Sequence, residues 1–242
     1  MTLTELKYSI LESIRPEIAD DDEIDDREVA FEIANQRALW IRNEINKKNR
    51  NISVNSEQTI CETVKVVSAA ECCTSDIKCT ILRTNRVIPP LISLHNDYSV
   101  SRIGPVDMTK PSFNIVSLPR AVYAGNGRFN KNDINAVLHR GYIYIFINPS
   151  SIVMRGLNKI AITGVFENPE DTFSFEGCNG TCYGDDSPYP LDRWMWNYIK
   201  PEVVRALLIN SELPNDDRND AARGKQQITT PKTNAEKQDN QG

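Results

Sequence analysis

The sequence has few of the residues that usually carry chemistry. Only two of its 242 residues are histidines, His95 and His139, and aromatic side chains make up 7%. It also lacks a basic surplus, because 33 acidic residues outnumber 28 lysines and arginines. A protein dedicated to nucleic acid usually carries a basic face. The charge balance therefore argues against a dedicated nucleic-acid binder, but not against a surface past which nucleic acid moves without binding.

Long apolar runs are absent as well. No stretch approaches the roughly 20 apolar residues that span a bilayer, and the N-terminus lacks the basic-then-apolar order of a signal peptide. We therefore expect a cytosolic protein, or part of a particle assembled in a cytosol. Because that compartment is reducing, the six cysteines are expected to be free thiols or metal ligands rather than a disulfide framework.

The first predicted helix begins with a capping box between Thr2 and Glu5 and ends at Pro16. In such a box, each side chain bonds the backbone amide of the other residue. One face of this helix is apolar over its whole length. Its members are Leu3, Leu6, Ile10 and Ile14.

A second helix is predicted from residue 26 to about Lys48. The acidic stretch 19–26 before it has too few apolar residues to pack and is interpreted as a solvated connector. Asp25 and Glu28 repeat the capping box, and Ile24 with Val29 is interpreted as a hydrophobic staple. Small residues on one face allow close packing, so a helical hairpin that packs within or between subunits is expected. That face comprises Ala30, Ala34, Ala38, Ile41 and Ile45, widened by Phe31 and Trp40.

After Ser56 the sequence changes to short runs rich in Val, Ile and Thr, which predict strands. The clearest run, 136–147, predicts a hairpin that turns at 139–141. Its second half is apolar on both faces and is therefore expected inside the sheet. One face carries Tyr142, Tyr144 and Phe146, and the other Ile143, Ile145 and Ile147. Further strands are predicted at 59–67, 76–83, 114–118 and 159–166.

A last helix is predicted to open at Pro188-Tyr-Pro190, since proline suits the first helical turn, and to run to about Leu208. Pro201 inside this run predicts a kink or two shorter helices. Its apolar positions are Trp194, Ile199, Val203, Ala206 and Leu207. The expected fold class is α+β. A helical portion (1–52) precedes a mainly antiparallel β domain (53–186), a C-terminal helix (187–213) and a disordered or partner-ordered tail (214–242).

The cysteines are the first candidates for a metal site. Cys178 and Cys182 stand four apart in the loop EGCNGTCYGDDSPYP, and four thiolates can hold a tetrahedral zinc. Their spacing is looser than the usual C-x2-C, however, and adjacent cysteines cannot easily both bind one ion. Cys61 and Cys79 are equally well explained as small apolar residues in strands. The remaining upstream cysteines are Cys72 and Cys73.

The other candidates are weaker. No nucleophile-elbow motif accompanies His95 or His139, which are interpreted as loop and turn residues. Gly125-Asn-Gly127 lacks the strand before it and the helix after it that a phosphate loop needs. Three carboxylates, Asp185, Asp186 and Asp192, could bind a divalent cation, but Asp185-Asp-Ser-Pro more simply caps the following helix. We therefore predict no catalytic, cofactor-binding or metal-binding residue.

Five segments in order resemble virion structural proteins of crAss-like phages, tailed phages that infect gut Bacteroidota. Within that group the chain is most similar to a ring or adaptor protein of the head-to-tail connector, over roughly its first 210 residues. The segments are Ser101–Asp107, Ala121–Phe129, Tyr142–Phe146, Ile162–Asp171 and Ser187–Leu191.

This resemblance implies a non-enzymatic ring subunit, twelve-fold in assembly, with a helical portion joined to a β portion below the portal. It implies portal and tail or ring proteins as partners, a DNA conduit without specific nucleic-acid binding, and no membrane or small-molecule substrate. The virion neck would be its location after assembly in the host cytoplasm. In this family the loop 177–186 would redirect the chain into the last helix. The alternative is a small zinc-stabilised binding or hydrolytic domain that uses the cysteines and 185–192.

Residues 214–242 contain no aromatic and almost no apolar side chain, so they cannot bury enough surface to offset the entropy of ordering. We predict that limited proteolysis of the free protein trims this segment first, as mass spectrometry of the fragments would show. Initial cleavage inside the β region, with residues 214–242 intact, would contradict the prediction.

Overall fold

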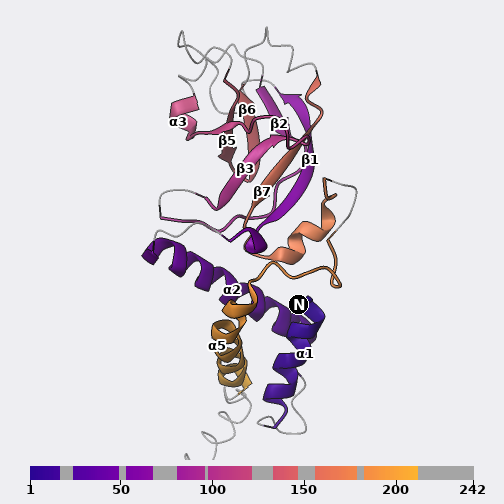
Figure 1. The fold of residues 1–242 in the computed structure, drawn as a ribbon, viewed down its shortest axis with the longest axis vertical. Coiled ribbons are helices and arrows are strands. Elements are labelled where there is room, and N and C mark those ends of the chain that lie inside the picture. The colour runs from indigo at the N-terminus through magenta and orange to yellow at the C-terminus, as the bar shows by residue number, and fades with distance from the viewer. Residues whose placement is uncertain are drawn as a thin grey trace, which may run out of the picture.

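The computed structural model describes residues 1–16, 24–48, 53–67, 81–95, 98–121, 133–146, 156–178 and 183–211. Figure 1 shows the long helices α1, α2 and α5 at one end of the molecule and the sheet at the other. The helices come from both ends of the described chain, and the strands come from its middle. The α+β class predicted from the sequence is confirmed.

Helix α1 (Leu3–Ile14) begins with the predicted capping box. The Glu5 amide donates to Thr2 Oγ1 at 3.2 Å, and the Thr2 amide donates to the Glu5 carboxylate at 3.0 Å. Leu3, Leu6 and the two isoleucines of the predicted face are all buried. The helix start and the buried face predicted from the sequence are therefore both confirmed for α1.

Helix α2 (Asp26–Lys48) begins beside Asp25, whose carboxylate accepts a hydrogen bond from the Arg27 amide at 3.2 Å. The predicted widening of its buried face by Phe31 is wrong, because that side chain is 70% exposed. Val29 and Ile33 form the buried side. Each lies two residues, or about 200° of helical rotation, from Phe31, which therefore points the other way.

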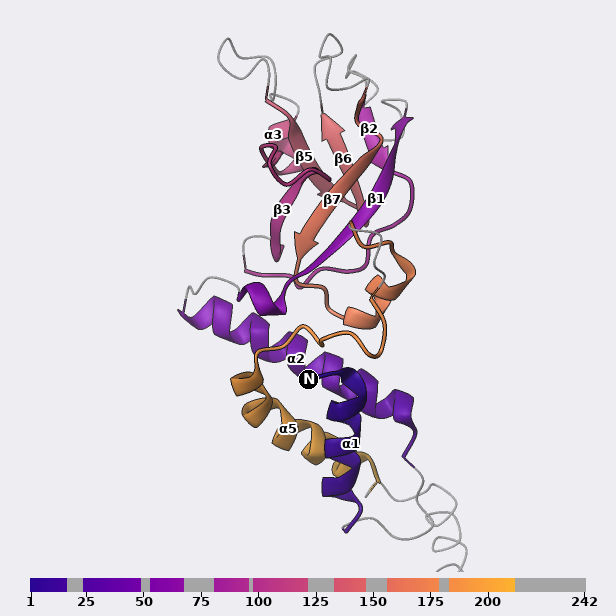
Figure 2. The same ribbon diagram turned by 45° about the vertical axis from the view of Figure 1, so that its right-hand side comes forward.

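Helix α5 (Arg193–Ser211) completes a cluster in which all three long helices share one apolar core. Figure 2 shows α2 lying between the sheet and the other two helices. The core combines Leu6 and Ile10 of α1 with Val29 and Ile33 of α2 and several residues of α5. The α5 members include Met195, Trp196, Ile199, Val203 and Leu207.

The predicted start of the last helix at Pro188–Pro190 is wrong. Pro188 instead forms an antiparallel bridge with Thr2, and the Tyr189 amide donates to the Met1 carbonyl at 2.9 Å. This pairing holds the segment extended, so the helix begins only at Arg193. Pro201 lies inside one continuous helix, which rules out the two-helix alternative. Ile199 before it and Val203 after it are both buried, so the helix stays packed on the core on either side of the proline.

The sheet contains seven strands in the order β3-β7-β1-β2-β6-β5-β4. Every neighbouring pair is antiparallel except β4 with β5. Residues 76–80 of one predicted strand lie outside the described residues. The strands are β1 (Gln58–Val67), β2 (Ile81–Thr84), β3 (Val100–Pro105), β4 (Asn114–Ile115), β5 (Asn135–His139), β6 (Tyr142–Phe146) and β7 (Lys159–Gly164).

The predicted hairpin is confirmed. β5 and β6 pair through His139 with Tyr142, and the turn residues Arg140 and Gly141 have φ angles of 50° and 75°. Two positive φ values are typical of the tight turns that match strand twist. β6 lies inside the sheet between β2 and β5. Ile143 and Ile145 join one cluster and its aromatic residues join another, as the alternation predicted, whereas Ile147 lies outside the described residues.

The predicted strand 114–118 is shorter than expected. β4 ends at Ile115, and a short helix, α3 (Leu118–Ala121), follows. Pro119 explains the change, since proline has no amide for a strand ladder but is tolerated in the first turn of a helix. Two 3-10 turns complete the described elements, η1 (Val54–Ser56) and η3 (Pro169–Ser174).

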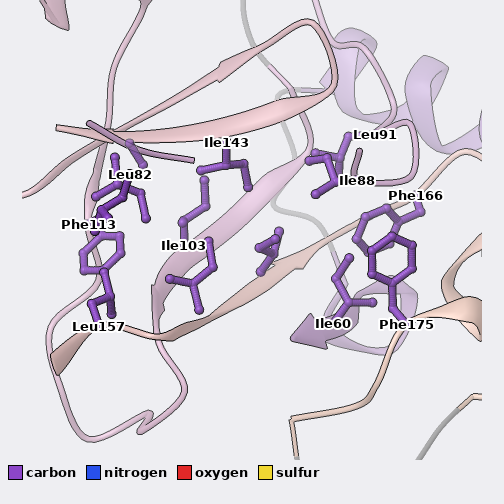
Figure 3. Packing of buried hydrophobic residues seen from close by; sticks show 14 residues of the cluster. Ile60, Leu82, Ile88, Leu91, Ile103, Phe113, Ile143, Leu157, Phe166 and Phe175 are labelled. Carbon is purple, nitrogen blue, oxygen red and sulfur yellow. The ribbon is translucent and has the colours of Figure 1, made fainter. Parts of the chain in front are cut away.

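The sheet curls around its main core. Ile103 of β3 and Ile143 of β6 belong to the same buried cluster, although three strands separate β3 from β6 in the sheet order. Figure 3 shows these side chains gathered between the strands with Phe113 and Leu157 at one end and Phe166 and Phe175 at the other. The Phe113 amide donates to the Ile103 carbonyl at 2.7 Å. The segment that leads into β4 therefore links the two edges of the sheet.

Arg37 of α2 joins the helical cluster to the sheet. Its side chain is fully buried, and its guanidinium donates to three backbone carbonyls in three separate segments. Nε bonds Pro190 at 2.8 Å, Nη1 bonds Phe166 at 2.9 Å, and Nη2 bonds Ser56 at 3.0 Å. These carbonyls precede α5, follow β7 and precede β1. One planar fork therefore fixes the relative position of all three segments.

Burial lowers the pKa of Arg37 from its ordinary value by desolvating the cation. The ring of Tyr189 lies beside it, with the Arg37 Cζ 5.9 Å from the ring centroid. Burial also raises the pKa of Tyr189 to about 12, so its hydroxyl is neutral at pH 7. The compensation for burying this charge therefore includes the dipoles of the three carbonyls.

A sharp glycine requirement lies at the end of β7. A Cβ on Gly164 would stand 2.6 Å from the Ser99 carbonyl oxygen, which real contacts do not allow. The close approach of the two backbones allows two hydrogen bonds at the next residue. The Val165 amide donates to the Ser99 carbonyl at 2.9 Å, and the Val165 carbonyl accepts from Ser99 Oγ at 2.7 Å. The segment Gly-Val-Phe-Glu-Asn-Pro is thus the structural joint that delivers the Phe166 carbonyl to Arg37.

We predict that Arg37→Met lowers the free energy of unfolding by about 3 kcal/mol or more, since each stranded buried acceptor costs roughly 1–3 kcal/mol. Urea unfolding followed by circular dichroism measures the effect. The control is Arg27→Met on the exposed side of the same helix, for which a change within about 0.5 kcal/mol is expected. Equal unfolding midpoints for the two variants would refute the role assigned to Arg37.

Candidate functional site

The cysteine prediction is wrong for two of the six residues. Cys61 and Cys178 form a disulfide with a Cα–Cα distance of 5.0 Å. The sheet brings them together across 117 residues of sequence, since the Cys61 amide also donates to the Glu176 carbonyl at 2.9 Å. Cys61 is thus not an unpaired strand residue, and Cys178 is not available as a zinc ligand. Cys72, Cys73, Cys79 and Cys182 lie outside the described residues.

An ion pair between the buried Glu62 and the half-exposed Arg86 lies close to this disulfide. The Glu62 carboxylate, only 2% exposed, accepts from Arg86 Nε at 3.0 Å and from Nη2 at 2.9 Å. The same guanidinium donates to the Ser174 carbonyl at 3.0 Å and stands 4.3 Å from the centroid of Phe175. Both links attach the segment 174–178 to β1. The carboxylate is held by a structural partner rather than presented to a substrate.

The two histidines do not form a catalytic arrangement with each other. His139 ends β5, where its ring centroid lies 6.3 Å from that of Tyr144. His95 lies in a loop, where its backbone amide donates to Asn46 Oδ1 at 3.2 Å. Both residues hold structural positions, in a hairpin and in a loop, as the sequence indicated.

The interpretation of Asp185 and Asp186 as the cap of the last helix is wrong, because α5 begins only at Arg193 and both residues lie in a turn before it. Asp192 precedes the helix, and its carboxylate accepts from Asn55 Nδ2 at 2.6 Å. In the part of the chain that the structure describes, no group of three or more His, Cys, Asp or Glu side chains could hold a metal ion. Residues 125–127 lie outside that part.

The remaining candidate is apolar surface on the helices. A groove of about 430 Å³ runs between α2 and the loops at 90–93 and 167–171. Ala34 and Ala38 form its floor, and the exposed Phe31 and Leu39 stand on its α2 side. The alanine face of α2 thus lies beside loops of the same chain. The sequence had instead suggested that another helix packs closely on this face. We call this surface the α2 groove.

A second apolar surface lies on α5. Trp194 and Tyr198 are 47% and 59% exposed, and both pack on Trp40 of α2. The Trp40 and Trp194 ring centroids are 5.2 Å apart in an edge-to-face arrangement, which fixes the rings at the surface. We call these three residues the aromatic platform. The sequence reasoning missed it because helical periodicity alone gave Trp194 a core position.

These surfaces suit contact with other proteins better than chemistry on a small molecule, since large exposed aromatic side chains are enriched at protein interfaces. None of the helices in the described ranges is long and apolar enough to cross a membrane.

No curated protein matches the chain. The family model of phage tail ring protein 2, from the crAss-like phages, matches residues 5–235. That range includes both apolar surfaces and the joint at Arg37. Because the match covers most of the sequence, this chain belongs to the phage tail ring protein 2 family, whose members are structural components of the virion tail rather than enzymes.

Proposed function

We propose that the protein is one subunit of a closed twelve-fold ring in the head-to-tail connector, where it joins the portal to the tail and encloses a passage for DNA. Family membership supports a ring in the tail. The placement below the portal, the copy number and the conduit are our own extension, based on the resemblance of five sequence segments to connector ring proteins.

The observation that carries the proposal is a group of large exposed apolar side chains on α2 and α5. Phe31, Leu39, Trp194 and Tyr198 are each at least 45% exposed. A subunit of an assembly buries such residues against its neighbours, and the burial of apolar area is the main driving force of association.

The charge of the chain fits a passage for DNA. Its formal net charge is -5, and closed symmetry repeats that surplus in every subunit around the ring. A strongly basic passage would bind phosphates and release counterions, which would hold the duplex in place. An acidic or nearly neutral passage lets it move.

We predict that the purified protein, alone or with the portal protein, forms a single closed species whose mass corresponds to twelve chains of 27.4 kDa. Native mass spectrometry and electron microscopy of the same sample measure copy number and closure. A protein that stays monomeric at tens of micromolar both alone and with the portal would refute the ring. A closed ring with another copy number would refute only the twelve-fold symmetry.

We also predict that the assembled ring has little affinity for duplex DNA at physiological salt. A filter-binding titration of the ring at several salt concentrations tests this. Tight binding that weakens steeply with added salt would mean that the surface grips phosphates, and the passive conduit would then be abandoned.

A further inference from the structure

The ring described above requires two different contact surfaces on each subunit, and this inference rests on that proposed function. A cyclic assembly of more than two identical chains uses a head-to-tail interface, in which one patch of a subunit meets a different patch of the next. The two patches must be complementary and must point in different directions. The α2 groove and the aromatic platform meet both requirements.

The two surfaces lie on opposite sides of α2. Phe31 stands on the groove and Trp40 supports the platform, nine residues later along the same helix. Nine residues correspond to about 900° of rotation, or two and a half turns, so the two side chains point in opposite directions. A subunit therefore cannot cover its own groove with its own platform. A neighbouring copy can.

The groove has the shape that an aromatic side chain needs. Ala34 and Ala38 on α2, with Pro90 and Ile92 on the loop side, give it an apolar part, beside which polar residues also line it. Its volume of about 430 Å³ is large enough for the exposed parts of Trp194 and Tyr198. Buried Trp and Tyr side chains that fill such pockets supply most of the binding energy at many interfaces.

The charges around the two surfaces are complementary. Two exposed carboxylates, Glu167 and Asp171, line the loop side of the groove and outnumber the one cation in its lining, Arg42 of α2. The exposed Arg193 directly precedes Trp194 at the start of α5, beside the platform. With the aromatic side chains in the groove, this guanidinium would come to the acidic side. Opposite charges at the rim favour one orientation of docking over others.

From these observations we propose that the aromatic platform of one subunit docks into the α2 groove of the next copy of this chain, and that repetition of this contact closes the ring. The occupant of the groove is therefore a second copy of the same protein. The contact pairs Trp194 and Tyr198 with Phe31, Leu39 and the alanine floor.

The test uses three matched variants of the full chain, each of which replaces an exposed aromatic residue on a helix with Glu. Phe31→Glu changes the groove, and Tyr198→Glu changes the platform. Tyr8→Glu is the control, because Tyr8 is 65% exposed on α1 and belongs to neither surface. Circular dichroism and thermal unfolding establish that all three fold as the unchanged protein does.

Sedimentation velocity then measures assembly. We expect the control to form the ring and each of the other two variants alone to remain monomeric. An equimolar mixture of Phe31→Glu and Tyr198→Glu should give a dimer and nothing larger. In that mixture one chain retains an intact platform and the other an intact groove, so a single head-to-tail contact forms and cannot propagate.

The other outcomes overturn the inference in distinguishable ways. Rings formed by both surface variants would show that neither surface makes the contact, while the proposed ring itself would stand. Dimers formed by either variant alone, or loss of the ring in the Tyr8→Glu control, would also reject this pairing of surfaces. If rings persist but binding of the portal is lost, the groove or platform serves a different protein. An unchanged protein that forms no ring, either alone or with the portal protein, would reject the proposed function as well.

Discussion

One buried guanidinium holds the architecture together. Arg37 reaches from α2 to three backbone carbonyls that belong to the approach to α5, the end of β7 and the turn before β1. A cation in the interior is tolerated only if its donors are satisfied, so these segments cannot shift without a large cost. Gly164 and the bonds between Val165 and Ser99 set the position of one acceptor. The pairing of residues 188–189 with the N-terminus sets another. The helical cluster and the sheet are thus joined by the hydrogen bonds of one buried side chain, Arg37.

The sheet side of the molecule has its own attachment. Glu62 with Arg86, and Cys61 with Cys178, fix the segment 174–178 to consecutive residues of β1. The disulfide spans 117 residues, and in the chain-entropy account a loop of that size stabilises the folded state by up to roughly 5 kcal/mol. The chain between β7 and α5 is therefore held near both of its ends by Arg37, at Phe166 and Pro190, and near its middle by this attachment. The helices and their exposed apolar surfaces consequently sit in a defined orientation relative to the sheet.

Local patterns predicted the local structure well. Capping residues and periodicity predicted α1, and alternation predicted the hairpin of β5 and β6 with both of its faces, because those features depend on neighbours in sequence. The errors arise where distant segments meet. Nothing near Cys61 indicates Cys178, and nothing near Pro188 indicates its pairing with Thr2. Phe31 and Trp194 have helical spacing that fits a core, yet α2 and α5 turn them outward. The candidate contact surfaces depend on exposure, which a single sequence does not give, so the sequence could not predict them.

The interleaved order of the elements also determines when each part can be completed. The helical cluster combines α1 and α2 with α5, and the whole sheet lies between them in sequence. At bacterial rates of synthesis, on the order of ten seconds separates the emergence of α2 from that of α5. During this interval the apolar faces of α1 and α2, including Leu6 and Ile33, have no α5 to cover them, and all strands of the sheet leave the ribosome before α5 does. The sheet can therefore form first, and the core that α1 and α2 share with α5 is completed only after α5 has been synthesised.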